Sequence, residues 1–122
     1  MINVLLIIKN DVVRSEIKRA LKKNNQRFIC FEFQETVTIL DLVKRYKLDI
    51  IVYDFYFTFN RFSKLFRKIK IYQPSPRLLL IFGDNDNVKL VDYLRFGISG
   101  CIQKPAKTED ICNAFKLILS GY

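Results

Sequence analysis

"LDIIVYDFYF", residues 48–57, is a run of branched and aromatic residues that predicts a strand buried on both faces of a sheet. One carboxylate, Asp54, interrupts this run. A lone carboxylate in apolar surroundings costs several kcal/mol unless a partner compensates for it. We therefore expect either that the strand ends at Asp54 or that a cation lies beside it.

The length and composition predict a single compact domain over residues 1–122. Half of the residues are hydrophobic and 27% are charged, and glycine and proline are scarce, which argues against disorder. Every apolar run is shorter than the roughly 18 residues that a membrane-spanning helix needs, and the amino terminus "MINVLLIIKND" lacks the features of an export signal. We expect a cytoplasmic protein without a membrane span.

The cysteines argue against a disulfide framework and against a structural zinc site. They are three in number and lack CxxC spacing, and the chain contains no histidine. We expect Cys30, Cys101 and Cys112 to be small core residues in a reducing compartment.

Short apolar runs alternate with amphipathic stretches along the whole chain. The runs that predict strands are residues 4–8, 28–33, 50–53, 78–82 and 100–103. The apolar positions that predict helices are Val13, Ile17 and Leu21; Val37, Leu40 and Val43; Phe62, Leu65, Phe66 and Ile69; Val88, Val91 and Leu94; and Ile111, Phe115 and Ile118. Five strands that alternate with five helices predict an α/β fold, a doubly wound parallel sheet with helices on both faces.

In such a sheet the chemistry lies beyond the carboxyl ends of the strands, near the point where the strand order reverses. Asp54 follows the third expected strand, Lys104 follows the fifth, and residues 9–11 follow the first. These residues should therefore lie at one edge of the sheet. A cation for Asp54 is available there from Lys9 or from Lys104.

With this (βα)5 pattern, with Asp54 after the third strand and with "GISGCIQKPAKTEDI" at residues 97–111, the chain resembles the receiver domain of two-component response regulators. Residues 97–105 are similar to that family's Gly-Ala-x-x-Tyr-Leu-x-Lys-Pro signature, and the spacing from Asp54 to Lys104 is typical of it. The resemblance covers nearly the whole chain. It implies a flavodoxin-like topology with strand order 2-1-3-4-5.

The resemblance also implies roles for three residues. Asp54 takes the position of the phospho-accepting aspartate, and Lys104 takes that of the lysine that contacts the phosphoryl group. Pro105 takes the position of a proline usually preceded by a cis peptide bond. The aspartate attacks phosphorus when magnesium, held on carboxylates, neutralises the charge on the phosphoryl oxygens.

The sequence departs from the family where that magnesium would bind. Receiver domains carry an acidic pair after the first strand, and this chain has "IIKND" instead. Depending on the register, Lys9 and Asn10 replace the pair, or Asn10 and Asp11 do. No metal or other cofactor is therefore expected, and if magnesium does bind, its ligands are Asp11 and Asp54. In the other register Lys9 repels the metal and pairs with Asp54.

Two further departures lie in the loops of the expected site. The hydroxyl that receiver domains place at the end of the fourth strand falls here on Phe82 or Gly83, and neither side chain can donate a hydrogen bond. After Asp54 the family usually has Met-Pro-Gly-x-Asp-Gly, and this chain reads "FYFTFNRF", which lacks that turn chemistry. The tract "GDNDN", residues 83–87, is better explained as a helix start with an Asp cap than as a calcium loop.

The net charge of +9 is unevenly distributed. No acidic residue occurs between residues 55 and 83, and the third expected helix has a basic face of Arg61, Lys64, Arg67 and Lys68. A second basic concentration falls on the first expected helix, across the sheet. Such surfaces attract acidic proteins, anionic membranes or nucleic acid, or are simply solvated, and no DNA-reading motif accompanies the charge.

Six aromatic residues surround Asp54 in the sequence: Tyr53, Phe55, Tyr56, Phe57, Phe59 and Phe62. If they are core residues, alternate members are buried. If they are functional, those after the strand form an apolar rim at the site. We expect about half of the cluster in the core and half at a partner-binding surface.

Together these features favour a signal-transduction domain of the receiver type that is not an enzyme and that acts without standard magnesium-dependent phosphorylation. The implied partners are a histidine kinase or a downstream effector, and a second copy of the chain through the fourth helix, fifth strand and fifth helix. Two alternatives stay open. One is a genuine phospho-acceptor that uses Asp54, and the other is a basic nucleic-acid-binding module on the same scaffold.

Overall fold

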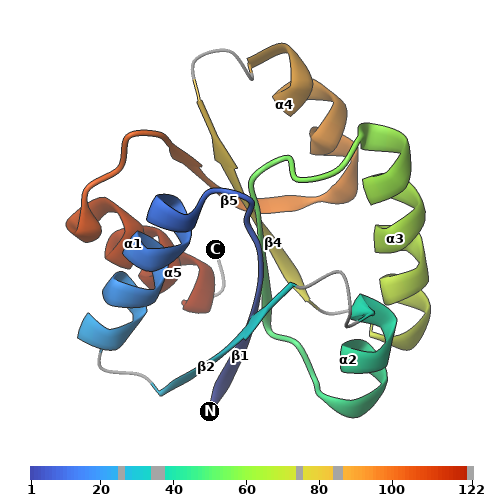
Figure 1. Ribbon diagram of the computed structural model, residues 1–122, viewed down its shortest axis with the longest axis horizontal. Helices are drawn as coiled ribbons and strands as arrows, with labels where there is room; N and C mark the ends of the chain where they lie inside the picture. The colour runs from blue at the N-terminus through green and yellow to red at the C-terminus, as the bar shows by residue number, and fades with distance from the viewer. Residues whose placement is uncertain (25–26, 34–37, 74–75, 84–86, 121–122) are drawn as a thin grey trace.

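In the computed structural model, a twisted sheet is enclosed by helices on both faces (Figure 1). The structure describes residues 1–24, 27–33, 38–73, 76–83 and 87–120, with the side chains of the last range from residue 90 onward. None of the described helices is long and apolar enough to cross a membrane.

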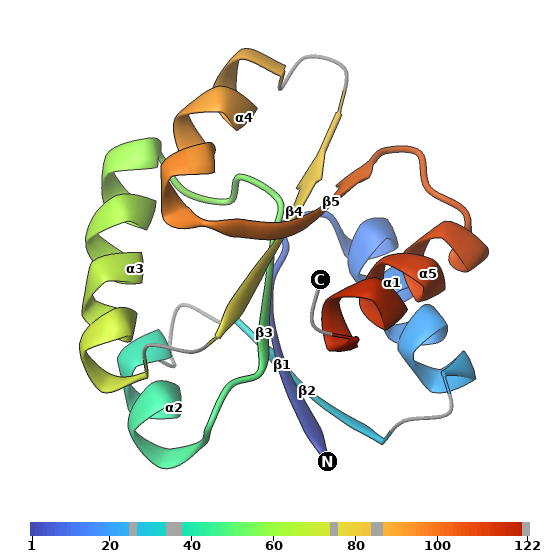
Figure 2. The same ribbon diagram turned by 180° about the vertical axis from the view of Figure 1, so that it is seen from behind.

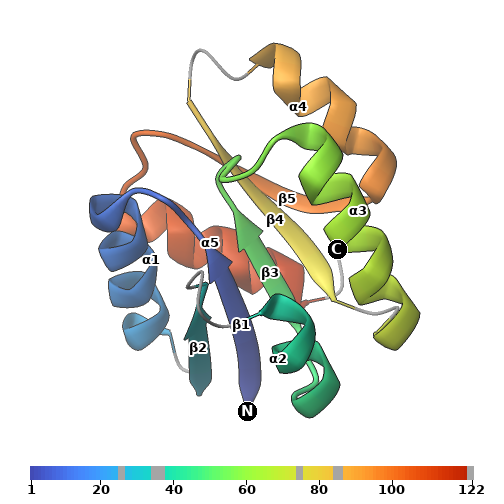
Figure 3. The same ribbon diagram turned by 45° about the vertical axis from the view of Figure 1, so that its right-hand side comes forward.

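Strands and helices alternate along the chain, as the periodicity predicts. The strands are β1 (Ile2–Ile7), β2 (Phe28–Glu32), β3 (Ile50–Tyr53), β4 (Arg77–Phe82) and β5 (Ile98–Gln103). The helices are α1 (Asp11–Lys23), α2 (Ile39–Arg45), α3 (Phe59–Tyr72), α4 (Asn87–Tyr93), the 3-10 turn η2 (Leu94–Phe96) and α5 (Thr108–Leu119). Within the described residues the strands pair in parallel in the order β2-β1-β3-β4-β5, which confirms the flavodoxin-like topology (Figure 3).

Helices cover the two faces of the sheet in two layers. One layer contains α1 and α5, and the other contains α2, α3 and α4 (Figures 1 and 2). The central strand β3 is fully buried because side chains from both layers pack on it. The first and third helices therefore lie on opposite faces of the sheet, as expected from a doubly wound chain.

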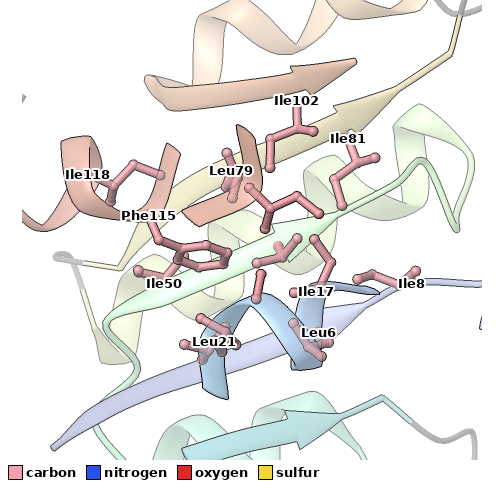
Figure 4. Packing of buried hydrophobic residues seen from close by; sticks show 14 residues of the cluster. Leu6, Ile8, Ile17, Leu21, Ile50, Leu79, Ile81, Ile102, Phe115 and Ile118 are labelled. Carbon is pink, nitrogen blue, oxygen red and sulfur yellow. The ribbon is translucent and has the colours of Figure 1, made fainter. Parts of the chain in front are cut away.

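The core under α1 and α5 is almost entirely aliphatic (Figure 4). Leu6, Ile50 and Leu79 project from three neighbouring strands toward Ile17 of α1 and Phe115 of α5. The core under α2, α3 and α4 is different, because aromatic rings fill much of it. This second core lies next to the loop that carries Asp54.

Strand ends differ from the predicted bounds where pairing extends past the apolar run. β1 begins at Ile2, because that residue pairs with Phe28 of β2. β5 begins at Ile98 instead of residue 100, because Ile98 pairs with Leu78 across a register shift in β4. Backbone pairing sets these ends, and hydrophobicity alone does not reveal it.

The predicted apolar face of α4 is wrong. Val91 is 65% exposed and Leu94 is 59% exposed, whereas Tyr93 between them is only 2% exposed. The helix turns its tyrosine inward, since a large ring fills the aromatic core better than a valine or leucine.

Other predictions have mixed outcomes. Cys30 and Cys112 pack against the core under α1 and α5, but Cys101 is exposed, so the expectation for Cys101 is wrong. Val37, the side chain of Val88 and the cap expected within residues 84–86 lie outside the described residues.

Candidate functional site at the carboxyl edge of the sheet

Asp54 lies immediately after β3, so the first of the two expected alternatives is confirmed: the strand ends before the carboxylate. The Asp54 N–H donates to the carbonyl of Ile7 at 3.3 Å, which ties the residue to the end of β1. The Lys9 N–H donates to both carboxylate oxygens, at 3.2 and 3.1 Å. A backbone amide therefore supplies the direct partner of Asp54.

Burial raises the pKa of the Asp54 carboxyl above its ordinary value. The Lys9 N–H, the positive charge of Lys104 and the Asn10 N–H each act in the opposite direction, because they favour the carboxylate form. Lys104 acts at a distance, since no ion pair with Asp54 forms among the residues that the structure describes. The pair of Asp54 with Lys9 or Lys104 suggested by the sequence is therefore not formed, and Lys9 contributes its backbone while its side chain is exposed.

Two polar side chains in the segment after β1, Asn10 and Asp11, interact with groups of helix α1. Asn10 is the N-cap of α1, and its Oδ1 accepts hydrogen bonds from the N–H groups of Val12 and Val13 at 2.8 and 3.1 Å. Asp11 pairs with Arg14 one helical turn later, at the solvent-exposed start of α1. Neither side chain is therefore directed to Asp54.

The side chains around Asp54 do not provide a suitable set of ligands for a magnesium ion. Mg²⁺ requires near-octahedral oxygen ligands, usually with one or two carboxylates among them. Asp54 supplies one, while the Asn10 oxygen caps α1 and one oxygen of Asp11 pairs with Arg14. In the described part of the chain no group of three or more Cys, Asp or Glu side chains is placed to hold a metal.

The other side of the site is formed by the ends of β4 and β5. Phe82 is the last residue of β4, and its carbonyl accepts from the Lys104 N–H at 2.7 Å. The bond between Lys104 and Pro105 is a cis peptide, as the resemblance implies. Phe82 thus stands at the strand end beside Lys104, and Gly83 follows it. No side-chain hydroxyl is present at either position.

A pocket of about 430 Å³ opens between α1 and the segment that follows β5. Lys104 and Asn10 contribute polar groups to its lining, and Ile81, Ile102 and Ile111 contribute apolar ones. It connects the site to the helical layer of α1 and α5.

The loop between Asp54 and α3 is held by a buried tyrosine. The Tyr53 hydroxyl accepts from the Phe57 N–H at 2.9 Å and donates to the Phe57 carbonyl at 3.0 Å. Phe55 has a φ of 64°, a left-handed conformation that costs a bulky residue about 1–2 kcal/mol. Thr58 then caps α3 by accepting from the Arg61 N–H at 3.2 Å. The loop is therefore ordered without the family's Pro-Gly turn.

The aromatic residues around Asp54 divide as the sequence predicts. Tyr53, Phe57 and Phe62 are buried, and the other three are half-buried. Those half-buried residues, Phe55, Tyr56 and Phe59, line a pocket of about 440 Å³ next to Tyr93 of α4. Half of the cluster is therefore core, as expected, and partner binding by the half-buried residues stays a prediction.

The basic face of α3 is exposed as predicted. Its cations are Arg61, Lys64, Arg67 and Lys68. None of these four takes part in the ion pairs found among described residues, which use Arg14 and Lys18. Arg61 lies over the Phe57 ring, with 4.2 Å between its guanidinium carbon and the ring centre.

The geometry and the sequence signature agree with one family. A model of the response regulator receiver domain matches residues 4–116. This chain belongs to the response regulator receiver family. Receiver domains serve signal transduction through kinases and effectors.

Similar proteins agree with this assignment. The Fimbriae Z protein of Salmonella typhimurium is 26% identical over 98% of this receiver domain, which spans only 57% of the length of that protein. A response regulator from Thermotoga maritima superposes with a TM-score of 0.81, at 18% identity, over 99% of both chains. A LuxR family DNA-binding response regulator from Silicibacter pomeroyi gives a TM-score of 0.74, at 24% identity, over 99% of this chain and 93% of that one.

Sequence reasoning missed one residue next to the site. Tyr93 looks like a polar member of an amphipathic helix, yet it is buried beside the Asp54 loop and contacts several rings. The dense aromatic content of residues 53–62 is a signal for a ring-lined cavity, but it does not show which helix fills it.

Proposed function

We propose that this receiver domain signals by binding protein partners, without standard magnesium-dependent phosphorylation of Asp54 and without enzymatic activity of its own. The observation that carries the proposal is the set of side chains near Asp54: the Asp54 carboxylate accepts from the Lys9 amide, while Asn10 caps α1 and Asp11 pairs with Arg14. After β1 the chain has Lys9, Asn10 and Asp11 where the family carries an acidic pair, so at most one carboxylate of that pair is available. A divalent cation there would lack the second carboxylate and would also approach the charge of Lys104.

The genuine phospho-acceptor is the second candidate, and one observation favours it. Burial raises the pKa of the Asp54 carboxyl, but the positive charge of Lys104 acts in the opposite direction, and the same charge would help to stabilise a phosphoryl group on that oxygen. Without a metal, this stabilisation rests on one ammonium and a few backbone amides. We expect phosphoryl transfer to be slow under these conditions.

The first surface at which we expect partner contact is apolar. The exposed residues Val91, Leu94 and Leu117 lie on α4, η2 and α5, where a second copy or an effector would gain apolar contact. Sedimentation velocity at increasing concentration tests the homodimer, and replacing Leu94 with Gln should then weaken it. A concentration-independent monomer would leave this face to another partner.

The basic face of α3 supports a third candidate, nucleic-acid binding, through its four exposed cations. Retention on a DNA duplex that falls steeply between about 50 and 200 mM salt would support it. The variant Lys64→Glu should bind more weakly, whereas Lys116→Glu, on α5, should retain binding. Equal loss in both variants would point to net charge alone.

The test of the main proposal is an amide NMR titration with magnesium, followed by magnesium with beryllofluoride, which mimics a phosphoryl group on aspartate. We expect no saturable shifts near Asp54 and Lys104 at millimolar magnesium. The matched variant combines Lys9→Asp and Asn10→Asp, which restores an acidic pair while aspartate keeps the N-cap. We expect this variant to bind magnesium. Saturable binding by the parent in the same range would refute the proposal.

A further inference from the structure

Two tyrosines join the loop after Asp54 to α4. The first, Tyr53, is fully buried and bonds both backbone groups of Phe57, as described above. A side chain that accepts from one backbone group and donates to the other holds the loop in one conformation. The loop therefore cannot change shape without breaking these bonds or moving the Tyr53 ring.

The second, Tyr93, is the anchor of α4. It is the one fully buried side chain among residues 90–93, the part of α4 whose side chains are described. Its ring lies against Tyr53, Phe55 and Phe59, with centroid distances of 5.7, 5.0 and 5.1 Å. Leu90 packs on the same core but is only partly buried, so within residues 90–93 the Tyr93 ring is the main buried contact, and the helix should follow that ring when it moves.

The two tyrosines also interact through their hydroxyls. Burial raises the pKa of both phenols, so both stay protonated near neutral pH, and the two hydroxyls lie close enough to influence each other's pKa. The Phe57 carbonyl can only accept, so it takes the proton of the Tyr53 hydroxyl. The Tyr53 oxygen then accepts from the Phe57 N–H with one lone pair, and its second lone pair is available to the neighbouring Tyr93 hydroxyl.

We infer that Tyr93 is a positioning residue that couples the loop after Asp54 to α4 through Tyr53, in a domain whose β4 ends in Phe82 instead of a hydroxyl residue. A change at Asp54 that shifts the loop displaces the Tyr93 ring and hydroxyl, and α4 follows. A partner that binds α4 acts on the loop by the same route, because coupling between two sites is reciprocal. The inference holds whether or not Asp54 accepts a phosphoryl group, so it goes beyond the proposed function.

The experiment perturbs Asp54 without phosphorylation or metal. Asp54→Asn removes the charge and keeps the acceptor oxygen, and amide chemical-shift differences between parent and Asp54→Asn map how far the change spreads. In the parent we expect differences in residues 55–58 and also in residues 90–93. In the Tyr93→Phe background the differences in residues 55–58 should persist, while those in residues 90–93 should fall to less than half.

Two control backgrounds separate coupling from simple loss of stability. Phe96→Leu removes a ring that contacts Tyr93 and is not in contact with Tyr53. This variant loosens the same core, but the chemical-shift differences caused by Asp54→Asn should still reach residues 90–93. Tyr72→Phe removes a hydroxyl from a half-exposed ring on α3 and should also have no effect. Amide exchange at Phe57 gives a second readout, and we expect it to speed up severalfold in Tyr93→Phe.

Two results would overturn the inference. One is a parent in which Asp54→Asn shifts the loop but leaves residues 90–93 unchanged. The other is a Tyr93→Phe background that transmits the change as well as the parent does and protects the Phe57 amide equally. If Phe96→Leu abolishes transmission as completely as Tyr93→Phe, the packing of the whole cluster is responsible and the assignment to Tyr93 is wrong.

Discussion

At the scale of single residues, backbone groups hold Asp54 more closely than charged side chains do. Its carboxylate accepts from the Lys9 amide, while Lys104 acts at longer range. Amide donors impose no net positive charge, so this aspartate is only partly compensated. Its charge therefore opposes folding, and the effect depends on pH.

Asp54→Asn should stabilise the protein, and more so at neutral than at acidic pH. Because the folded-state pKa of Asp54 is raised, its contribution to stability is fully present below the unfolded pKa and is lost as pH rises through the folded value. The asparagine cannot ionise, and its carbonyl oxygen can still accept from Lys9. Urea unfolding of both proteins at about pH 3 and about pH 7 measures the difference.

The control for this prediction is Glu109→Gln, which neutralises an exposed carboxylate on α5. It should not show the same gain between the two pH values. An Asp54→Asn protein that is less stable than the parent at neutral pH would mean that Lys104 compensates the charge more fully than burial penalises it.

At the scale of elements, caps and packing set where each helix ends and which face it buries. Asn10 and Thr58 start α1 and α3 through side-chain oxygens. Gly97 ends the 3-10 turn η2 with a φ of 74° and leads into β5. Its role is conformational, since a Cβ built there meets no atom within 4 Å.

Gly97→Ala should lower the free energy of unfolding by about 1–2 kcal/mol, because alanine is strained in the left-handed region. Gly97→Asn should lose less, since asparagine adopts that conformation more readily. Urea midpoints of the two variants and the parent check the prediction. Equal losses for Ala and Asn would show that the cost is not the backbone conformation.

At the scale of the whole molecule, the net charge of +9 destabilises the folded state, because like charges repel one another. The cations of α3 contribute to it because helix α3 contains no acidic residue. Like charges three or four residues apart on a helix are destabilising by tenths of a kcal/mol per pair. Added salt screens this repulsion, so the melting temperature should rise as ionic strength increases.

Lys64→Glu should raise the free energy of unfolding by about 0.5–1 kcal/mol at low salt, because the new carboxylate faces Arg61 and Lys68 on the same helix face. It should also flatten the dependence of the melting temperature on salt. Lys64→Gln, which removes the charge without adding a partner, should give about half of the gain. A Glu variant no more stable than the Gln variant would show that the pairs do not form.

The amino-acid sequence by itself determined the fold and the places of the candidate site residues in it. Hydrophobic periods of two and 3.6 residues specify strands and helices, their alternation specifies a parallel sheet, and such a sheet brings the carboxyl ends of its strands to one edge. The position of Asp54 at the end of β3 and the family signature around Lys104 follow from this local information.

Only the tertiary structure decided how the side chains are used. It placed the amide of Lys9 on Asp54, left the Lys9 side chain exposed, and turned Tyr93 of α4 into the aromatic core in place of Val91 and Leu94. These outcomes depend on how rings from distant segments fill one volume. Packing of this kind arises only when the layers assemble, so the hydrophobic pattern of a single helix or strand does not predict it.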